Sequence, residues 1–66
     1  MERLRNLRED RYLKRMDIAK VLHVTPTTIS NYESGRREPG IRELILLADF
    51  FDVSIDYLVG RTIRKK

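Results

Sequence analysis

The sequence predicts an all-α fold, a single compact domain of five short helices. Apolar side chains recur three and four positions apart, most clearly between Ile41 and Phe51, which is the period of an amphipathic helix. Helix start and stop signals frame another stretch, with Thr25-Pro26 before it and Gly35 after it. A chain of 66 residues has room for one domain only.

Composition narrows the possible functions. Fourteen Lys and Arg residues against ten Asp and Glu give a net charge of +4, which favours a polyanionic partner. With no cysteine and one histidine, we expect no metal site, and no catalytic constellation or phosphate loop is evident, so we expect no cofactor and no enzyme activity. No apolar run approaches the ~20 residues of a membrane span, and the start Met1-Glu2-Arg3 is charged. We therefore expect a cytoplasmic protein without a membrane partner.

The first helix is expected over Glu2–Asp10. Leu4 and Leu7 form its apolar stripe, and the acidic Glu2 suits the positive end of a helix. Arg8 lies four positions after Leu4, close to the buried stripe, so we interpret it as structural. Three other arginines are expected to be solvated, with a phosphate contact as the alternative: Arg3, Arg5 and Arg11.

A second helix is expected from Lys14 to Leu22, followed by a tight corner at His23-Val24. Ile18, Ala19 and Leu22 share one apolar face of this helix.

The third helix begins at Thr25-Pro26. The Thr25 hydroxyl can cap it, and Pro26 fits the first helical position because its missing N–H would have no partner there. Ile29 and Tyr32 are three apart and must face inward. The outer surface is then small, polar and able to form hydrogen bonds: Thr27, Thr28, Ser30 and Asn31.

Ser34-Gly35 ends the third helix, and a loop follows from Arg36 to Gly40. Gly35 supplies a positive φ at the helix end. Ser34 can donate to a phosphate, and the adjacent Arg36 and Arg37 are well placed to hold a nucleic-acid backbone.

The fourth helix is expected over Ile41–Phe51. Its core wall is predicted to comprise Ile41, Leu44, Ile45, Leu47, Ala48 and Phe51. Leu46 and Phe50 lie away from that face. They are either incidentally exposed or part of a homodimer patch. The predicted patch consists of Leu46, Phe50, Tyr57, Val59 and Ile63.

The last helix is expected over Ile55–Val59, capped by Ser54 and ended by Gly60. We thus predict a domain over residues 1–60 and a basic tail over 61–66, which we expect to be frayed.

Two short helices joined by a tight corner, here residues 14–35, constitute a helix-turn-helix motif, whose second helix enters the major groove of DNA. From Leu4 to Leu58 the chain resembles the Cro and lambda-repressor type of bacterial and phage helix-turn-helix domain. The matching residues are Arg3-Leu4-Arg5, Leu7-Arg8, Ile18-Ala19, Val24-Thr25, Thr28-Ile29-Ser30, Tyr32-Glu33, Gly35, Pro39, Leu44, Leu47-Ala48, Val53-Ser54 and Tyr57-Leu58.

The resemblance implies a five-helix lambda-repressor-like fold and an ion pair between Arg8 and Glu33. It places His23 where the family usually has Gly, so His23 is expected in the left-handed region of the backbone. Lys14 and Arg15 depart from the usual Ser or Thr cap and Gln. Neither can accept the capping hydrogen bond, but both can reach a phosphate.

We predict two sets of DNA-contacting residues. Asn31 can pair with adenine, and a threonine can contact a thymine methyl group. The expected base contacts are Pro26, Thr27, Thr28 and Asn31. The expected phosphate contacts are Lys14, Arg15, Thr25, Ser34, Arg36 and Arg37.

The favoured hypothesis is a sequence-specific regulator of transcription that binds double-stranded DNA, acting as a repressor on a palindromic operator as a homodimer. The alternative is a protein-interaction module, such as the antitoxin of a toxin–antitoxin pair, whose main contacts are to a partner protein. The apolar patch around Leu46 and Phe50 and the lack of long polar readers on the third helix support that alternative.

Overall fold

The computed structural model describes residues 1–66 and contains five helices and no strand, which confirms the predicted fold class. The helices are α1 (Glu2–Asp10), α2 (Arg15–Leu22), α3 (Pro26–Ser34), α4 (Ile41–Phe51) and α5 (Ile55–Leu58). No helix is both long and apolar enough to cross a membrane.

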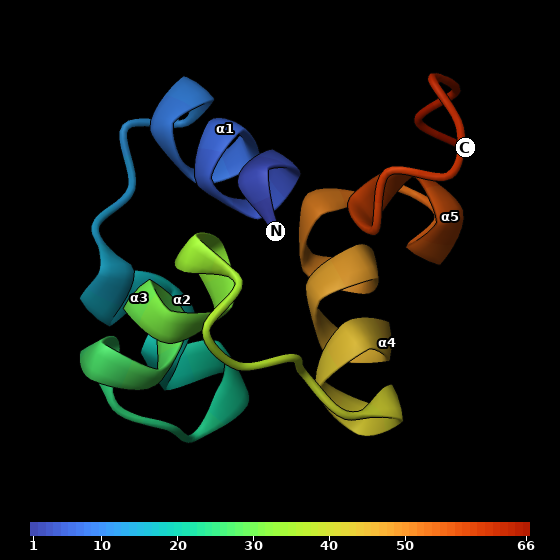
Figure 1. Ribbon diagram of the computed structural model, residues 1–66. Coiled ribbons are helices and arrows are strands. Elements are labelled where there is room, and N and C mark those ends of the chain that lie inside the picture. Colours follow the sequence, from blue (N-terminus) through green and yellow to red (C-terminus); the bar gives the residue numbers. More distant parts are fainter.

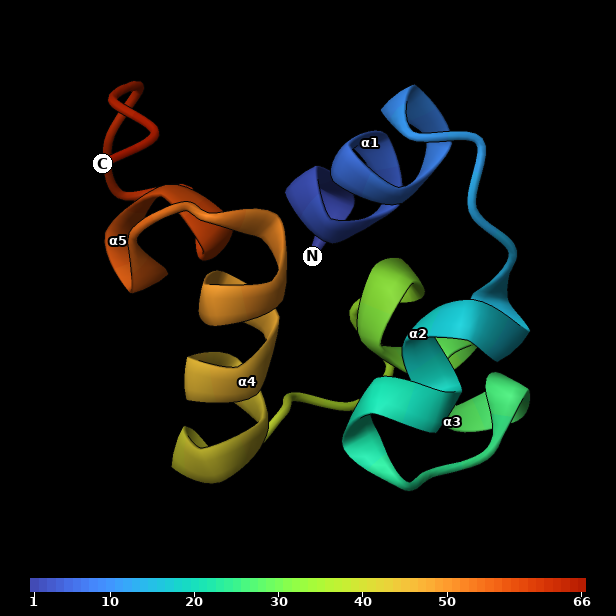
Figure 2. The same ribbon diagram turned by 180° about the vertical axis from the view of Figure 1, so that it is seen from behind.

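The helices form two neighbouring groups. Figure 1 shows α1, α2 and α3 on one side and α4 and α5 on the other, joined by the extended segment that follows α3. In the view from behind, α2 lies in front of α3 (Figure 2). α3 packs against α1 and α2, while α4 packs against α2 and α5. One flank of α3 therefore remains at the edge of the molecule.

A single hydrophobic core joins all five helices. Leu4, Ile18, Ile29, Leu47 and Leu58, one from each helix, have at most 1% of their surface exposed. The complete cluster is Leu4, Leu7, Ile18, Ala19, Leu22, Ile29, Tyr32, Leu47, Phe51 and Leu58. Burial of these side chains supplies the main driving force for the fold.

The predicted helix ends are present. Thr25 is the N-cap of α3 and its hydroxyl accepts the Thr28 N–H, with Pro26 in the first position. Gly35 ends α3 at φ 79°. Ser54 caps α5 by accepting the Tyr57 N–H at 2.9 Å. These short-range signals are readable from the sequence because the partner atoms lie within three residues.

Three residues other than glycine adopt a positive φ: Tyr12 (57°), His23 (58°) and Asp52 (55°). The left-handed expectation for His23 is confirmed. Tyr12 closes the turn after α1 with a ring that is 95% exposed. A bulky side chain is unusual in this region of the backbone, so the link between α1 and α2 is strained.

The prediction for the buried face of α4 is wrong at Ile41, Ile45 and Leu46. Ile41 is 71% and Ile45 46% exposed, whereas Leu46 is half-buried against the core. Burial centres on Leu47 and Phe51, and with about 100° between successive residues, Ile45 lies about 160° around the helix from Leu47. Because α4 contacts both α2 and α5, positions beside its main face also lose exposure.

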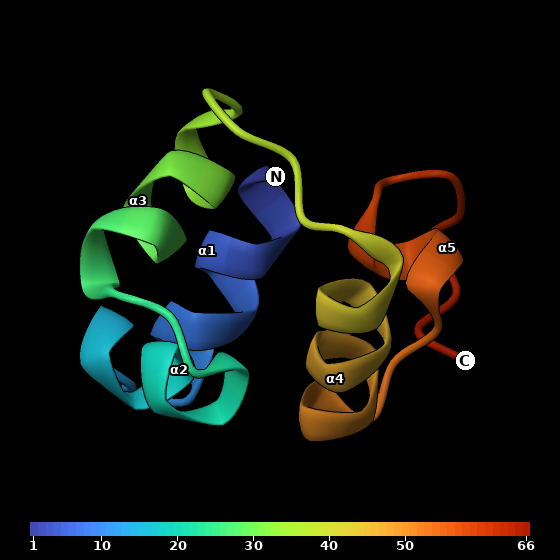
Figure 3. The same ribbon diagram turned by 90° about the horizontal axis from the view of Figure 1, so that it is seen from below.

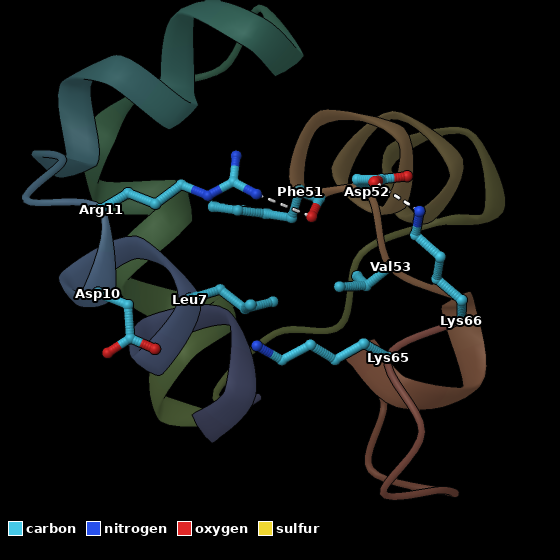
Figure 4. Close-up of a pocket in the computed structure, with 8 residues that line it drawn as sticks. All are labelled: Leu7, Asp10, Arg11, Phe51, Asp52, Val53, Lys65 and Lys66. Carbon is cyan, nitrogen blue, oxygen red and sulfur yellow. Dashed lines mark hydrogen bonds and ion pairs between the residues drawn. The ribbon is translucent and has the colours of Figure 1, made fainter.

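Two arginines that we expected to be solvated are structural. Arg3 donates to the backbone carbonyls of Tyr57 and Thr62, and its guanidinium lies 4.2 Å from the centre of the Tyr57 ring. Arg11 donates to the carbonyls of Phe50 at 3.3 Å and Phe51 at 2.9 Å. Figure 4 shows the Arg11 side chain extended alongside Phe51. Arg11 thereby satisfies carbonyls at the end of α4, where a positive charge is favourable.

The basic tail folds back instead of fraying. The Ser54 N–H donates to the Lys65 carbonyl, and the Lys66 ammonium lies 2.8 Å from an oxygen of Asp52. Lys65 extends toward Leu7, so the tail covers one edge of the groove drawn in Figure 4. The tail is held by backbone hydrogen bonds that composition alone does not reveal.

Candidate nucleic-acid interface

The inner side of α3 is anchored in the core. Ile29, Tyr32 and Glu33 are buried, and the α-amino group of Met1 donates to the Tyr32 carbonyl at 2.8 Å, at the last turn of α3. Figure 1 shows the chain start beside that turn. The core contacts and this cap fix the rotation of α3 about its own axis.

The outer side of α3 is polar. Thr27 is exposed, Ser30 and Asn31 are half-buried, and none of these side chains forms a hydrogen bond within the protein. Their spacing of three and four places them on one stripe, opposite Ile29. In Figure 3, α3 stands at the margin of the molecule, away from α5. The expected base-contacting side chains Thr27 and Asn31 therefore keep their donors and acceptors available.

The start of α3 uses part of its polar capacity internally. The hydroxyls of Thr25 and Thr28 are 3.0 Å apart, and Thr25 also accepts the Thr28 N–H at 3.2 Å. Pro26 is half-buried. Of the four expected base contacts, Thr28 is thus partly committed to the cap and Pro26 offers only apolar surface.

The end of α3 leads into the arginine loop, which we define as residues 35–40. The Ser34 hydroxyl donates to the Asn31 carbonyl at 3.2 Å, and the same carbonyl accepts the Arg37 N–H. The side chains of Arg36 and Arg37 are exposed and form no hydrogen bond or ion pair within the protein. Backbone contacts hold the loop while its guanidinium groups remain free.

A buried carboxylate joins α1, α2 and α3. The Arg8 Nε lies 2.7 Å from Glu33 Oε2, which is the ion pair that the resemblance implied. The hydrogen bond with Glu33 raises the pKa of Arg8 above its usual value, although burial opposes the shift. Arg15 also donates from its Nε to Glu33 Oε1 at 3.1 Å. The sequence analysis did not anticipate the Arg15 contact, because it had already paired Glu33 with Arg8.

The start of α2 has a cap that the sequence analysis missed. Asp17 accepts the Lys14 N–H at 2.8 Å. The Lys14 side chain carries no acceptor, so only this half of a capping box forms. An acidic residue at the third helical position was the available signal. Lys14 itself is exposed, and its ammonium has no partner in the protein.

The expected dimer residues are divided by the structure. Leu46 and Tyr57 are half-buried and contribute to the protomer, with Arg3 over the Tyr57 ring. Phe50, Val59 and Ile63 are 36%, 43% and 87% exposed. Only the latter three keep substantial apolar surface available for a partner.

Comparisons with known proteins agree with this geometry. A family model described as helix-turn-helix matches residues 4–58. The HTH-type transcriptional regulator AnsR of Bacillus subtilis (strain 168) is 36% identical over 66 residues, covering all of this chain and 57% of AnsR. The cryptic phage CTXphi transcriptional repressor RstR of Vibrio cholerae is 35% identical over 60 residues, covering 91% of this chain and 54% of RstR.

A solved structure, a transcriptional regulator from Listeria innocua, is similar with a TM-score of 0.85 and 42% sequence identity. The match covers 89% of this chain and 55% of that chain. The chain thus spans about half the length of these three proteins.

Proposed function

The chain belongs to the helix-turn-helix family of DNA-binding transcriptional regulators, which is not a class of enzymes, and on this premise we propose that it is a repressor that binds a palindromic operator as a homodimer. The observation that carries the proposal is the outer stripe of α3. Thr27 and Asn31 lie there without partners inside the protein, and the unpaired Arg36 and Arg37 follow in the loop after α3. A helix with this surface fits the major groove of DNA.

Base discrimination is assigned first to Asn31. A side-chain amide can donate to adenine N7 and accept from the adenine N6 amino group, and such a pair contributes about 1–3 kcal/mol of discrimination. Thr27 offers a hydroxyl and a methyl group from the neighbouring position. Thr28 and Pro26 add apolar contact, because the Thr28 hydroxyl is shared with Thr25.

Phosphate affinity is assigned to residues that follow α3 and to residues at the start of α2. Arg36 and Arg37 follow α3, and Lys14 and Arg15 lie at the start of α2. Each neutralised phosphate releases counterions, so binding should weaken steeply with salt. Thr25 and Ser34 are proposed as minor contacts, because both hydroxyls already take part in hydrogen bonds within α3.

Two copies would insert their α3 helices into successive major grooves about 34 Å apart. Phe50, Val59 and Ile63 are the expected dimer residues that retain exposed apolar surface. A 66-residue domain buries only about 60% of its unfolded surface and is marginally stable, so burying more apolar surface against a second copy would stabilise it. The repressor assignment follows the analogy with RstR, which is named a repressor.

The decisive experiment is selection of bound duplexes from a random DNA pool at two salt concentrations. A symmetric motif with a steep salt dependence supports the homodimer on a palindrome. Asn31→Ala should weaken binding to the selected site more than binding to random DNA, whereas Asn6→Ala, at an exposed position of α1, should change neither. Equal loss on both duplexes would remove Asn31 as a base reader.

A second candidate, a module whose main contact is a partner protein, is favoured by the apolar surface of α4 and α5. Ile41 is 71% exposed, and Val59 lines a hollow with Met1, Pro39 and Leu44. Co-purification from the native host separates the two functions. A stoichiometric partner protein supports this candidate, and its absence together with operator binding supports the first.

A further inference from the structure

We propose that Glu33 is a positioning residue that holds Arg15 in place for a backbone phosphate. The proposal rests on the DNA-binding function above and deepens it, because it names a buried group that governs one phosphate contact. Glu33 itself cannot touch DNA, since its side chain is only 3% exposed. Its effect on DNA binding must pass through a residue that it contacts, and of its two arginine partners Arg15 is the partly exposed one.

Glu33 serves two arginines from different helices. Arg8 of α1 binds it through Nε at 2.7 Å and Nη2 at 3.3 Å, and the remaining Nη1 of Arg8 donates to the Leu13 carbonyl. Every nitrogen of the Arg8 guanidinium is thereby used within the protein. Since Arg8 is also only 8% exposed, it is not available to DNA.

Arg15 is held by one nitrogen only. Its Nε donates to Glu33 Oε1 at 3.1 Å, and no hydrogen bond within the protein uses Nη1 or Nη2. The side chain is 45% exposed. A guanidinium is planar, so fixing Nε also fixes the plane and direction of the outer nitrogens. Those nitrogens form the fork that binds a phosphate with two hydrogen bonds.

The local charges agree with this role. Arg8 and Arg15 share the Glu33 carboxylate, and Glu9 lies 4.0 Å from Arg8 and 3.6 Å from Arg5. These three arginines and two glutamates leave one net positive charge, and Arg15 is the partly exposed arginine that contacts Glu33. Arg15 is also the first residue of α2, where the positive helix end disfavours a cation. Glu33 offsets that repulsion without neutralising the face presented to DNA.

The Arg15–Glu33 ion pair also fixes the position of Arg15 relative to α3. Glu33 belongs to the last turns of α3, which carries Asn31 two positions earlier, and Arg15 belongs to α2. The ion pair therefore couples a phosphate anchor to the base-reading helix. Loss of the coupling should weaken binding to all sequences, because phosphate contacts carry no base information.

The test compares two carboxylates by fluorescence anisotropy on a labelled random-sequence duplex at two salt concentrations. Glu33→Gln and Glu38→Gln each remove one negative charge, and Glu38 is an exposed residue of the arginine loop without an ion pair. Charge alone predicts tighter binding for both. We expect Glu38→Gln to tighten binding slightly and Glu33→Gln to weaken it roughly five- to tenfold, the scale of one ordinary hydrogen bond.

Arg15→Lys provides a second measurement if Glu33→Gln fails to fold. Lysine keeps the charge but has only one nitrogen. It cannot bind Glu33 through one nitrogen and at the same time offer two others to a phosphate. We expect Arg15→Lys to lose nearly as much affinity as Arg15→Gln, while Arg64→Lys, at an exposed tail position without a side-chain partner, leaves the affinity unchanged. The slope of log affinity against log salt should fall by about one unit in Arg15→Gln.

A double variant separates positioning from a general structural effect of Glu33. If Glu33 acts through Arg15, Arg15→Gln/Glu33→Gln should bind no more weakly than Arg15→Gln alone. Additive losses, or Glu33→Gln binding as tightly as Glu38→Gln, or Arg15→Lys binding like the unaltered chain, would overturn the inference while leaving the proposed function intact. If the unaltered chain binds no duplex at either salt concentration, the proposed function fails and the inference with it.

Discussion

Three arginines in and just after α1 and the two of the arginine loop are chemically identical but have opposite roles. In and just after α1, Arg3, Arg8 and Arg11 all donate to groups of the same chain. In the loop, Arg36 and Arg37 donate to nothing within it. The difference teaches that the role of an arginine depends on whether the fold supplies an acceptor.

Arg15 stands between the two groups, with one nitrogen engaged and two available. The variants below are ordered by their expected effect on the free energy of unfolding. The α1 group should affect stability, and the loop group should affect only DNA binding.

Arg8→Met should have the largest effect. It removes the main partner of the buried Glu33 carboxylate, and breaking a buried pair in this way costs about 3–5 kcal/mol. Because Arg15 still contacts Glu33, we expect a loss near the lower bound. Urea unfolding followed by circular dichroism measures it.

The control for Arg8→Met is the double variant Arg8→Met/Glu33→Met. With both charges removed, no buried carboxylate is left unpaired, so most of the lost stability should return. If the double variant is less stable than Arg8→Met, the destabilisation comes from lost packing around Arg8 and not from the stranded charge.

The Arg8–Glu33 pair also shows how far sequence reasoning reaches. Its partners are 25 residues apart, and only resemblance to a known family pointed to it. The caps at Thr25 and Ser54, by contrast, follow from neighbouring residues. Arg3 and Arg11 were misassigned because their acceptors are carbonyls of helix ends and of the tail, 39 to 59 residues away. Nothing in the identity of those acceptor residues marks them.

The face of α4 was mispredicted for a related reason. Periodicity indicates that a helix has an apolar side but does not say which neighbours cover it. α4 lies between α2 and α5, so Leu46 lost exposure while Ile41 and Ile45 kept it. The outer stripe of α3 was easier to predict, because one buried side with Ile29 and Tyr32 leaves the opposite side polar.

Arg11→Met should have an intermediate effect. It removes two hydrogen bonds to the carbonyls of Phe50 and Phe51 and the positive charge at the end of α4. Since Arg11 is solvent-exposed, we expect a loss of about 1–2 kcal/mol, measured by urea unfolding. Arg5→Met is the matched control in α1: its exposed pair with Glu9 should contribute less than about 0.5 kcal/mol. Equal losses would mean that the Arg11 cap adds nothing specific.

Tyr12→Gly and His23→Gly should each raise stability modestly. Both residues have a positive φ, which costs about 1–2 kcal/mol for a residue with a Cβ. Glycine removes that cost, but its greater conformational entropy in the unfolded chain offsets part of the gain. A net gain of about 0.5–1 kcal/mol would raise the melting temperature by a few degrees. Tyr12 lies in the link that brings Arg8 and Arg15 to the same carboxylate. A lower melting temperature for Tyr12→Gly would show that the tyrosine ring stabilises this link by packing. A fall in the melting temperature for His23→Gly would show that the His23 side chain stabilises the corner by more than its left-handed backbone costs.

Arg36→Ala and Arg37→Ala should leave stability within about 0.5 kcal/mol of the unaltered chain, because both are exposed residues without a partner. DNA binding should nevertheless weaken for every sequence, and the slope of log affinity against log salt should fall by about one unit for each variant. Arg64→Ala in the tail removes the same charge away from α3 and controls for net charge. If Arg64→Ala lowers the slope equally, the loop arginines act only through total charge. If Arg36→Ala is instead as destabilising as Arg11→Met, the loop has an internal acceptor and the division between the two groups of arginines is wrong.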